Sequence, residues 1–203
     1  KKQTGGAGQF GEVFLRVEPL PRGTGFQFVD EVKGGTIPTQ FIPAVEKGIH
    51  QVLAAGPLGG YQVQDLKVTV YDGKHHPVDS KEIAFITAGR RALLDAMMKA
   101  KSIILEPIVN IEINAPEAAM GDIAGDLSAK RGQVSGTDSI PRGTTVVSGK
   151  VPLSALDKYQ GRLKSVTGGQ GSYSIELSHY DPVPPQVQQQ ITASHKSAHE
   201  EEE

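Results

Sequence analysis

Residues 72–80 of the chain read Asp-Gly-Lys-His-His-Pro-Val-Asp-Ser, and the hydrophobic period of the sequence changes across them. Before this stretch, residues 63–70 alternate between apolar and polar, which predicts a strand. After it, apolar residues recur at helical spacing, and Asp79 followed by Glu82 predicts a capping box at the helix start. We call residues 72–80 the histidine loop. A polar loop held between a strand and a helix is typical of a binding surface.

The segments around the histidine loop predict a mixed α+β domain. Residues 13–17 and 26–32 alternate like strands, and residues 42–53 repeat like an amphipathic helix. Ile103 and Ile104 are candidates for a further short strand. The helix that follows the histidine loop has a predicted buried stripe of Ile83, Ile86, Leu93, Leu94 and Met97.

The predicted domain boundary follows residue 104, beside Glu106-Pro107, where a proline interrupts an apolar run. Beyond it, the pattern predicts the order β-α-β-β-α-β, which is the ferredoxin-like or split βαβ plan. The predicted strands are residues 108–113, a segment near Val134, 144–151 and 172–180, and the predicted helices are residues 117–131 and 154–166. The sequence thus predicts three parts: residues 1–104, a ferredoxin-like domain of residues 105–183, and a C-terminal helix with an acidic tail, residues 184–203.

Composition restricts the class of protein. The 203 residues are 37% hydrophobic, enough for one large core or two small ones. The absence of cysteine excludes disulfides, thiolate nucleophiles and sulfur-based zinc sites, and it fits a reducing compartment. No apolar run approaches the ~18 residues of a membrane helix. We therefore expect a cytoplasmic protein without a membrane partner. Because position 1 is lysine and not methionine, we also expect a piece of a longer protein.

Charge is unevenly distributed along the chain. Residues 1–104 carry 13 basic and 10 acidic side chains, whereas residues 105–203 carry 8 and 13. Four of these acids form the terminal run at residues 200–203. A basic surface of the kind that covers a whole nucleic-acid-binding domain is absent, so any RNA contact must be local.

Residues 5–11 read Gly-Gly-Ala-Gly-Gln-Phe-Gly, and we call them the glycine loop. Their spacing matches the glycine motifs of kinases and dinucleotide-binding folds, but neither context is present. A Rossmann turn must follow a strand, and the catalytic segments of a kinase do not follow. Two interpretations remain, a turn that enters a strand and a close approach of the backbone to RNA. Residues 168–172 lack the lysine of a P-loop, so no GTPase or ATPase core is predicted.

His75 and His76 admit three interpretations. The first is a metal or acid–base site with Asp72 and Asp79, although neighbouring side chains of an extended segment point to opposite sides. The second is a solvated turn. The third is RNA contact, because imidazoles stack on unpaired bases and donate to phosphates while Lys74 adds charge.

Lys130 and Arg131 end a predicted helix and admit two interpretations. Cations there interact favourably with the negative end of the helix dipole. The same two side chains are also candidates for contact with RNA phosphates.

The chain resembles the fourth and fifth domains of elongation factor G over residues 1–194. The segments that carry the resemblance are Gly5-Gly6-x-Gly8-Gln9, Lys33-Gly34-Gly35-x-Ile37-Pro38, Ile42-Pro43-Ala44-Val45, Ala55-Gly56-Pro57-Leu58, Asp79-Ser80, Leu105-Glu106-Pro107, Gly121-Asp122-x-x-Gly125-Asp126-Leu127, Arg131-Gly132 and Val151-Pro152-Leu153. The resemblance implies an α+β protein in which an elongated, ribosomal-protein-like βαβ domain precedes the ferredoxin-like domain.

The same resemblance implies that the glycine loop and the histidine loop together form the tip of the first domain. This tip enters the decoding site of the small ribosomal subunit, beside tRNA and mRNA, while the ferredoxin-like domain lies beside large-subunit rRNA. The implied contact residues are Gly6, Gly8, Gln9, Lys74, His75, His76, Lys130 and Arg131. No catalytic residue, metal or cofactor is expected in this fragment, since GTP and magnesium belong to a GTPase domain that it lacks. A monomer is expected.

Three positions depart from the family pattern. Ala7, Gln170 and Lys130 stand where arginine or another basic residue is common, which softens phosphate contacts. The resemblance implies the ribosome-binding part of a GTPase that promotes translocation of tRNA and mRNA. The alternative is a divergent paralogue that acts in ribosome recycling or ribosome protection. Two alternatives come from other classes of protein: a metal or acid–base enzyme at His75 and His76, and a freestanding RNA-binding or scaffolding module.

Overall fold

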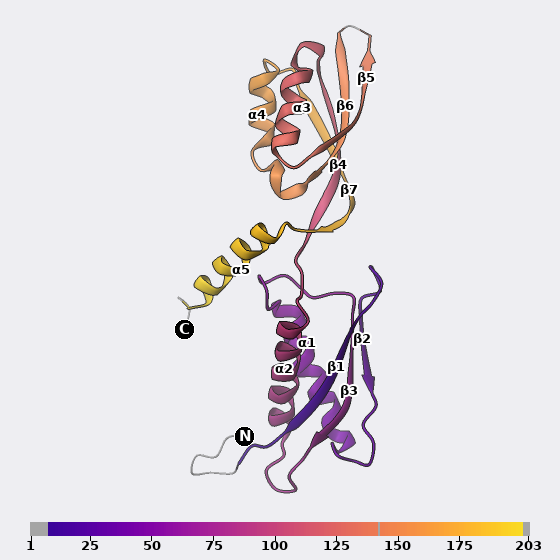
Figure 1. Cartoon of the computed structure of the whole chain (residues 1–203), viewed down its shortest axis with the longest axis vertical. Coiled ribbons are helices and arrows are strands. Elements are labelled where there is room, and N and C mark those ends of the chain that lie inside the picture. The colour runs from indigo at the N-terminus through magenta and orange to yellow at the C-terminus, as the bar shows by residue number, and fades with distance from the viewer. Residues whose placement is uncertain (1–7, 142, 201–203) are drawn as a thin grey trace. The chain divides into compact units, whose positions relative to one another are not determined.

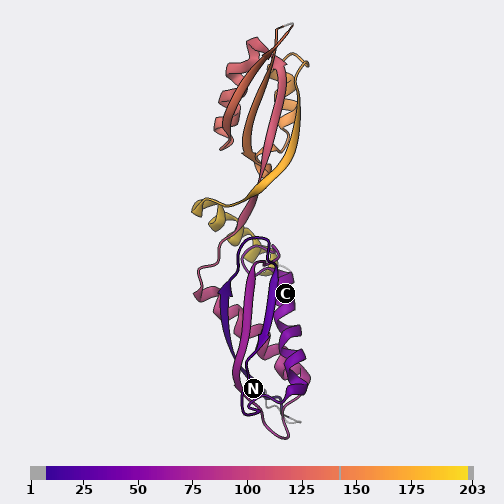
Figure 2. The same cartoon turned by 90° about the vertical axis from the view of Figure 1, so that its right-hand side faces the viewer.

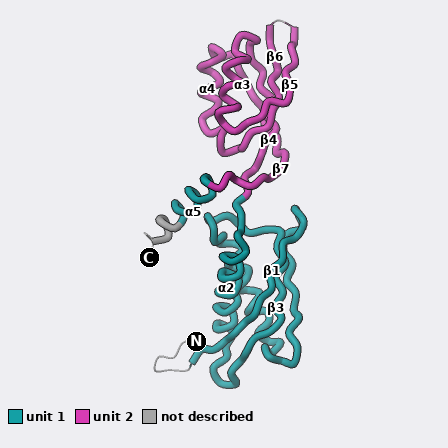
Figure 3. Tube along the Cα trace, in the orientation of Figure 1, with its two compact units in different colours: residues 1–104, 186–203 teal, residues 105–185 magenta. Residues whose placement is uncertain are grey.

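The chain folds into two compact units, which Figure 3 colours separately. The computed structural model describes residues 8–141 and 143–200, with side chains up to residue 195. The first unit consists of residues 1–104 together with 186–203, and the second of residues 105–185. Within the described residues, no helix is both long and apolar enough to cross a membrane.

The first unit is a three-stranded sheet covered on one face by two helices (Figures 1 and 2). Its strands are β1 (Glu12–Pro19), β2 (Phe26–Asp30) and β3 (Leu66–Lys74), in the order β1-β3-β2. Strand β3 pairs antiparallel with β1 and parallel with β2. Parallel neighbours need a crossover, which the 3-10 turn η1 (Thr39–Phe41) and helix α1 (Ile42–Ala55) supply. Helix α2 (Glu82–Lys99) follows β3.

The core of the first unit lies between the sheet and the two helices. Its fully buried side chains include Val45, Ile49, Val68, Val70, Phe85 and Leu93. Helices α1 and α2 approach closely at Gly48, where an added Cβ would overlap the carbonyl oxygen of Ile86. Only glycine fits that crossing, so the separation of the two helices depends on it.

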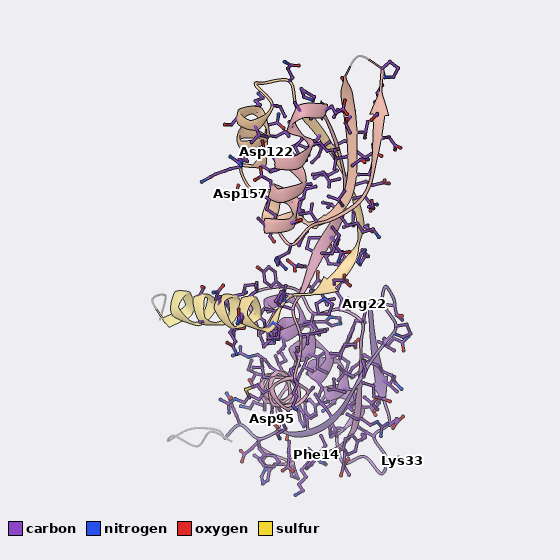
Figure 4. All side chains as sticks on the ribbon, turned by 45° about the horizontal axis from the view of Figure 1, so that its top comes forward. Phe14, Arg22, Lys33, Asp95, Asp122 and Asp157 are labelled. Carbon is purple, nitrogen blue, oxygen red and sulfur yellow. The ribbon has the colours of Figure 1, made fainter. Side chains whose placement is uncertain are left out.

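The second unit has the ferredoxin-like topology, as the sequence predicted. Its strands β4 (Leu105–Pro116), β5 (Gln133–Ile140), β6 (Thr144–Pro152) and β7 (Ser172–Pro182) form an antiparallel sheet in the order β5-β6-β4-β7. Helix α3 (Met120–Ala129) follows the turn η2 (Glu117–Ala119), and α4 (Tyr159–Val166) follows η3 (Leu153–Leu156). Figure 4 shows side chains filling the space between this sheet and its helices.

The last helix, α5 (Pro185–Glu200), belongs to the first unit from residue 186 onward. The side-chain oxygen of Gln188 accepts a hydrogen bond of 3.0 Å from the backbone N–H of Ile104, and its nitrogen donates one of 3.2 Å to the carbonyl of Ser102. Gln188 thus satisfies the backbone of a segment that has no strand partner. The predicted strand at Ile103 and Ile104 is wrong, since residues 102–104 lie outside every strand.

Several predicted details near the histidine loop are also wrong. The N-cap of α2 is Lys81, with no side-chain hydrogen bond, so Asp79 and Glu82 do not form a capping box. Ile83 was predicted to be buried but is 50% exposed, because it points outward in the first turn of the helix. Phe85, which is fully buried, contributes to the core in its place. Strand β3 continues to Lys74, four residues beyond its predicted end at residue 70. Residues 72–74 of the histidine loop therefore pair with β1.

The predicted helix over residues 154–166 is divided into two. Turn η3 ends at Leu156, and α4 begins only at Tyr159. Between them Lys158 adopts the left-handed conformation, with φ of 56°, which interrupts the helical path.

Candidate functional site

Three segments of the first unit meet at the end where β1 begins and β3 ends, at the lower end of that unit in Figure 1. They are the described part of the glycine loop, residues 8–11, the connection at residues 34–37 between β2 and η1, and the histidine loop, which begins at the end of β3 and leads toward α2. Residues 8–11 of the glycine loop and the histidine loop together form the tip. Hydrogen bonds between their backbones and side chains, described below, hold them in contact.

The histidine loop is joined directly to the glycine loop. The backbone N–H of Phe10 donates to the carbonyl of Asp79 over 2.9 Å. The hydroxyl of Ser80 donates to the carbonyl of Phe10, also over 2.9 Å. The Phe10 ring lies edge-on to the imidazole of His76, with centroids 6.5 Å apart. Both polar groups of the Phe10 backbone are thus used for this junction.

Within the histidine loop, bonds from the backbone orient His76. The N–H groups of Val78 and Asp79 lie 3.3 and 3.2 Å from Nδ1 of the imidazole. The backbone N–H of His76 donates to the hydroxyl of Ser80 over 2.8 Å, and the N–H of Ser80 returns a bond of 3.1 Å to the carbonyl of His76. Although the His76 side chain is 52% exposed, its ring is therefore held in one direction.

His75 and Lys74 have different partners from His76. Nδ1 of His75 lies 3.2 Å from the carbonyl oxygen of Thr36, in the connection between β2 and η1. Nζ of Lys74 lies 3.8 Å from a carboxylate oxygen of Glu12 on β1, and both side chains are solvent-accessible. A pair of this kind is worth little in water, so the ammonium group remains available to an anion.

Glycines leave space for close contacts at two places in the tip. A Cβ on Gly8 would lie 2.8 Å from the carboxyl carbon of Asp79, so the carboxylate occupies the space that a side chain would take. A Cβ on Gly73 would overlap the carbonyl oxygen of Glu12, within the paired backbones of β1 and β3. Gly73 thus permits the backbones of β1 and β3 to pack closely, whereas Gly8 leaves room for the Asp79 carboxylate.

The structure brings together five of the eight residues that the sequence indicated as RNA contacts. Gly8, Gln9, Lys74, His75 and His76 all lie at the tip, with Gly8 buried and the other four exposed. Gly6 and the departing residue Ala7 lie outside the described residues. Lys130 and Arg131 belong to the second unit.

Lys130 and Arg131 both have partners within the second unit. The guanidinium of Arg131 donates two bonds, of 2.5 and 2.9 Å, to the carboxylate of Glu106, whose side chain is only 10% exposed. These bonds to Glu106 raise the pKa of Arg131. Nζ of Lys130 donates to the carbonyl of Ala155 over 2.8 Å and lies 5.7 Å from the centre of the Tyr159 ring. Their role as RNA contacts remains a prediction.

The arrangement of the tip is suited to presenting polar groups outward. Among the residues that the structure describes, no group of three or more His, Cys, Asp or Glu side chains is placed to hold a metal ion. The exposed side chains include two imidazoles, an ammonium, the Gln9 amide, the 77%-exposed Val78 and the carboxylate of Asp72. Such a surface can donate hydrogen bonds to phosphates and bases and pack an apolar side chain against them.

Sequence reasoning missed three residues that hold the tip together: Phe10, Thr36 and Ser80. Two of them act partly or wholly through backbone atoms, which residue identity does not reveal. Ser80 belongs to the Asp79-Ser80 segment that carries the family resemblance, so the sequence did draw attention to it. Its position at the junction of the two loops could be seen only in the folded structure.

Two family models match the chain in succession. The model for elongation factor G, domain IV, matches residues 1–101, and the model for the elongation factor G C-terminus matches residues 103–191. The elongation factor G of Aquifex pyrophilus is 45% identical over 190 residues, which cover 94% of this chain and 27% of that protein. The chain thus spans about a quarter of the length of this curated relative.

A solved structure shares the fold. A crystal structure of a protein from Thermus thermophilus matches with a TM-score of 0.76 and 38% sequence identity. The match covers 97% of this chain and 29% of that one.

Proposed function

Because the chain belongs to the elongation factor G family, we propose that it is the ribosome-binding part of a translation factor that promotes movement of tRNA and mRNA. In this proposal the tip of the first unit enters the decoding site of the small subunit. The second unit contacts large-subunit rRNA, and the protein acts as a cytoplasmic monomer.

One observation carries the proposal: the glycine loop and the histidine loop form a single bonded structure through Phe10, Asp79 and Ser80. Two separate flexible loops would yield when a tRNA moved back against them. A joined tip resists displacement, because one backbone hydrogen bond and one bond from the Ser80 hydroxyl link the two loops. Such a tip supports a steric role, in which it occupies space that the codon–anticodon helix has left and biases diffusion of the tRNA in one direction.

The exposed groups of the tip also suit an RNA partner. Lys74 and His76 offer hydrogen-bond donors, His75 offers an acceptor, and Lys74 adds a positive charge at one end of residues 1–104, which carry a small excess of basic side chains. With so few phosphate contacts, the chain alone should bind RNA weakly and with a shallow salt dependence. Affinity for the ribosome then requires the rest of the factor, in which a GTPase domain holds GTP and magnesium. The chain by itself is not an enzyme in this proposal.

A chimera tests the proposal. This chain replaces the matching segment of the Aquifex pyrophilus elongation factor G, and single-round translocation is measured by rapid mixing with saturating factor. We expect the chimera to be active, and His76→Ala to slow translocation at least tenfold. His179→Ala is the matched control, since His179 is an exposed histidine of the second unit.

Two outcomes count against the proposal. If His76→Ala moves tRNA as fast as the unmodified chimera, the tip does not carry the function. If the chimera binds ribosomes but supports only recycling or release of a bound inhibitor, the chain comes from a specialised paralogue.

A further inference from the structure

Ser80 occupies the position where the two loops of the tip meet. Its hydroxyl donates to the carbonyl of Phe10 over 2.9 Å and accepts from the backbone N–H of His76 over 2.8 Å. A carbonyl oxygen can only accept and an amide N–H can only donate, so the bridging group must do both. Among side chains of this size, only a hydroxyl does so. An alanine at this position would leave both backbone groups without these partners.

The hydrogen bonds around His76 determine which ring nitrogen carries the proton. The N–H groups of Val78 and Asp79 are donors, so Nδ1 must offer them a lone pair. In the neutral ring the proton is then on Nε2. A proton on Nδ1 would instead face the Asp79 carboxylate, 3.6 Å away, at the loss of both backbone bonds. Within the described residues, Nε2 of His76 has no hydrogen-bond partner, so its N–H is available to an external acceptor.

The neighbouring His75 has the opposite arrangement. Its Nδ1 lies 3.2 Å from the carbonyl oxygen of Thr36, which can only accept, so Nδ1 must donate. The neutral ring of His75 therefore has its lone pair on Nε2. Two adjacent imidazoles of the tip thus differ in what they offer: His76 offers a donor and His75 an acceptor.

We propose that Ser80 is a positioning residue that fixes His76 as a hydrogen-bond donor at the surface of the tip. The hydroxyl holds the backbone of His76, which keeps the N–H groups of Val78 and Asp79 directed at Nδ1. This inference rests on the proposed function for its ligand, which is an acceptor atom of RNA such as a phosphate oxygen or a base carbonyl. A donor fixed before contact loses little conformational freedom on binding.

The tautomer can be measured on the chain alone by long-range ¹⁵N–¹H correlation of the imidazole nitrogens. For His76 we expect Nδ1 in the range of an unprotonated nitrogen and Nε2 in the range of a protonated one, with the reverse for His75. Ser80→Ala should convert the His76 pattern to an average of both tautomers and accelerate exchange of the His76 amide about tenfold. Ser80→Thr keeps the hydroxyl and should restore both readouts.

Ser135→Ala is the matched control, because Ser135 lies on β5 in the second unit and its hydroxyl makes one bond, to the carbonyl of Ser148. It should leave the His76 signals unchanged. A purely structural effect of Ser80→Ala would lower the melting temperature without changing the tautomer.

Three results would overturn the inference. The first is an Nδ1-protonated or averaged His76 in the unmodified chain. The second is a Ser80→Ala variant with an unchanged imidazole pattern and amide exchange rate. The third result applies if Ser80→Ala fails to fold, in which case Ser80→Thr tests the inference. An average of both His76 tautomers in Ser80→Thr would then overturn it. None of these measurements involves ribosomes, so failure here is distinguishable from failure of the translocation assay.

Discussion

Replacing Arg131 by methionine tests whether this residue stabilises the second unit or serves only as an external contact. The substitution keeps an unbranched side chain of similar length and removes the two bonds to Glu106. Breaking a fully buried ion pair by removing one partner costs about 3–5 kcal/mol. The Glu106 side chain is 10% exposed but that of Arg131 is 40% exposed, so water can partly replace the lost bonds. We therefore expect a loss of about 2–3 kcal/mol in the free energy of unfolding of the second unit.

Hydrogen exchange followed by NMR gives this free energy for one unit at a time. The amides of β6, which lies between β5 and β4, exchange through unfolding of the second unit. Arg162→Met is the matched control, because it breaks the more exposed pair between Arg162 and Asp126 and should lower the stability much less than Arg131→Met. Combining Arg131→Met with Glu106→Gln should recover part of the loss, because no buried carboxylate is then left unpaired.

A change below about 0.5 kcal/mol in the β6 amides would refute this reasoning. If the same variant nonetheless weakened ribosome binding, Arg131 would act as an RNA contact, as the sequence indicated. Loss of both stability and binding would mean that its effect on binding arises through the fold.

Three further predictions concern packing and ionisation. Gly48→Ala should destabilise the first unit by about 2–3 kcal/mol in urea unfolding, because the added Cβ would meet the carbonyl of Ile86. In contrast, Gly121→Ala should stabilise the second unit slightly, because Gly121 lies on α3 with open space around its Cβ position. The buried hydroxyl of Tyr159 has no hydrogen-bond partner within the described residues. Tyr159→Phe should therefore leave the free energy of unfolding at pH 7 unchanged or raise it by about 1–2 kcal/mol. A lower melting temperature of the variant would contradict this. Burial raises the pKa of Tyr159 from 10.0 to about 12, so the folded state holds the proton more tightly than the unfolded state. The stability that this shift contributes should be fully present below the unfolded pKa and fall by about 3 kcal/mol as the pH rises through the folded pKa, and Tyr159→Phe should abolish that fall.

Apart from the strand wrongly expected at residues 103–104, the order of the elements could be predicted from the hydrophobic period, and so could the topology of the second unit. Strand-like alternation over residues 144–151 is reproduced in β6, where alternate side chains face the helices. The ferredoxin-like order followed because β-α-β-β-α-β restricts the possible pairings to a few. Boundaries were less predictable. Helix α2 begins at Glu82 without the expected cap, because backbone contacts and not a side chain set its start.

The sequence indicated residues that lie together at this end of the first unit, and their role as contacts remains a prediction; the bonds that join them could not be predicted. Period and polarity indicated His75 and His76, and the resemblance indicated Gly8 and Gln9. The bonds that join the loops involve the backbone of Phe10 and the hydroxyl of Ser80, which are 70 positions apart in the chain. Contacts of that separation depend on the pairing of β1 with β3, which no local pattern specifies.

Directed probing from the tip tests most directly whether this end of the molecule contacts ribosomal RNA. The chain has no cysteine, so Val78→Cys, at an exposed position of the histidine loop, gives this segment of the chimera a single attachment point for a hydroxyl-radical source. Ile140→Cys, at the end of β5, is the control. On ribosomes, we expect residue 78 to cleave small-subunit rRNA around the decoding site, with a different pattern from residue 140. Absence of decoding-site cleavage from residue 78, while the chimera remains bound, would contradict the account.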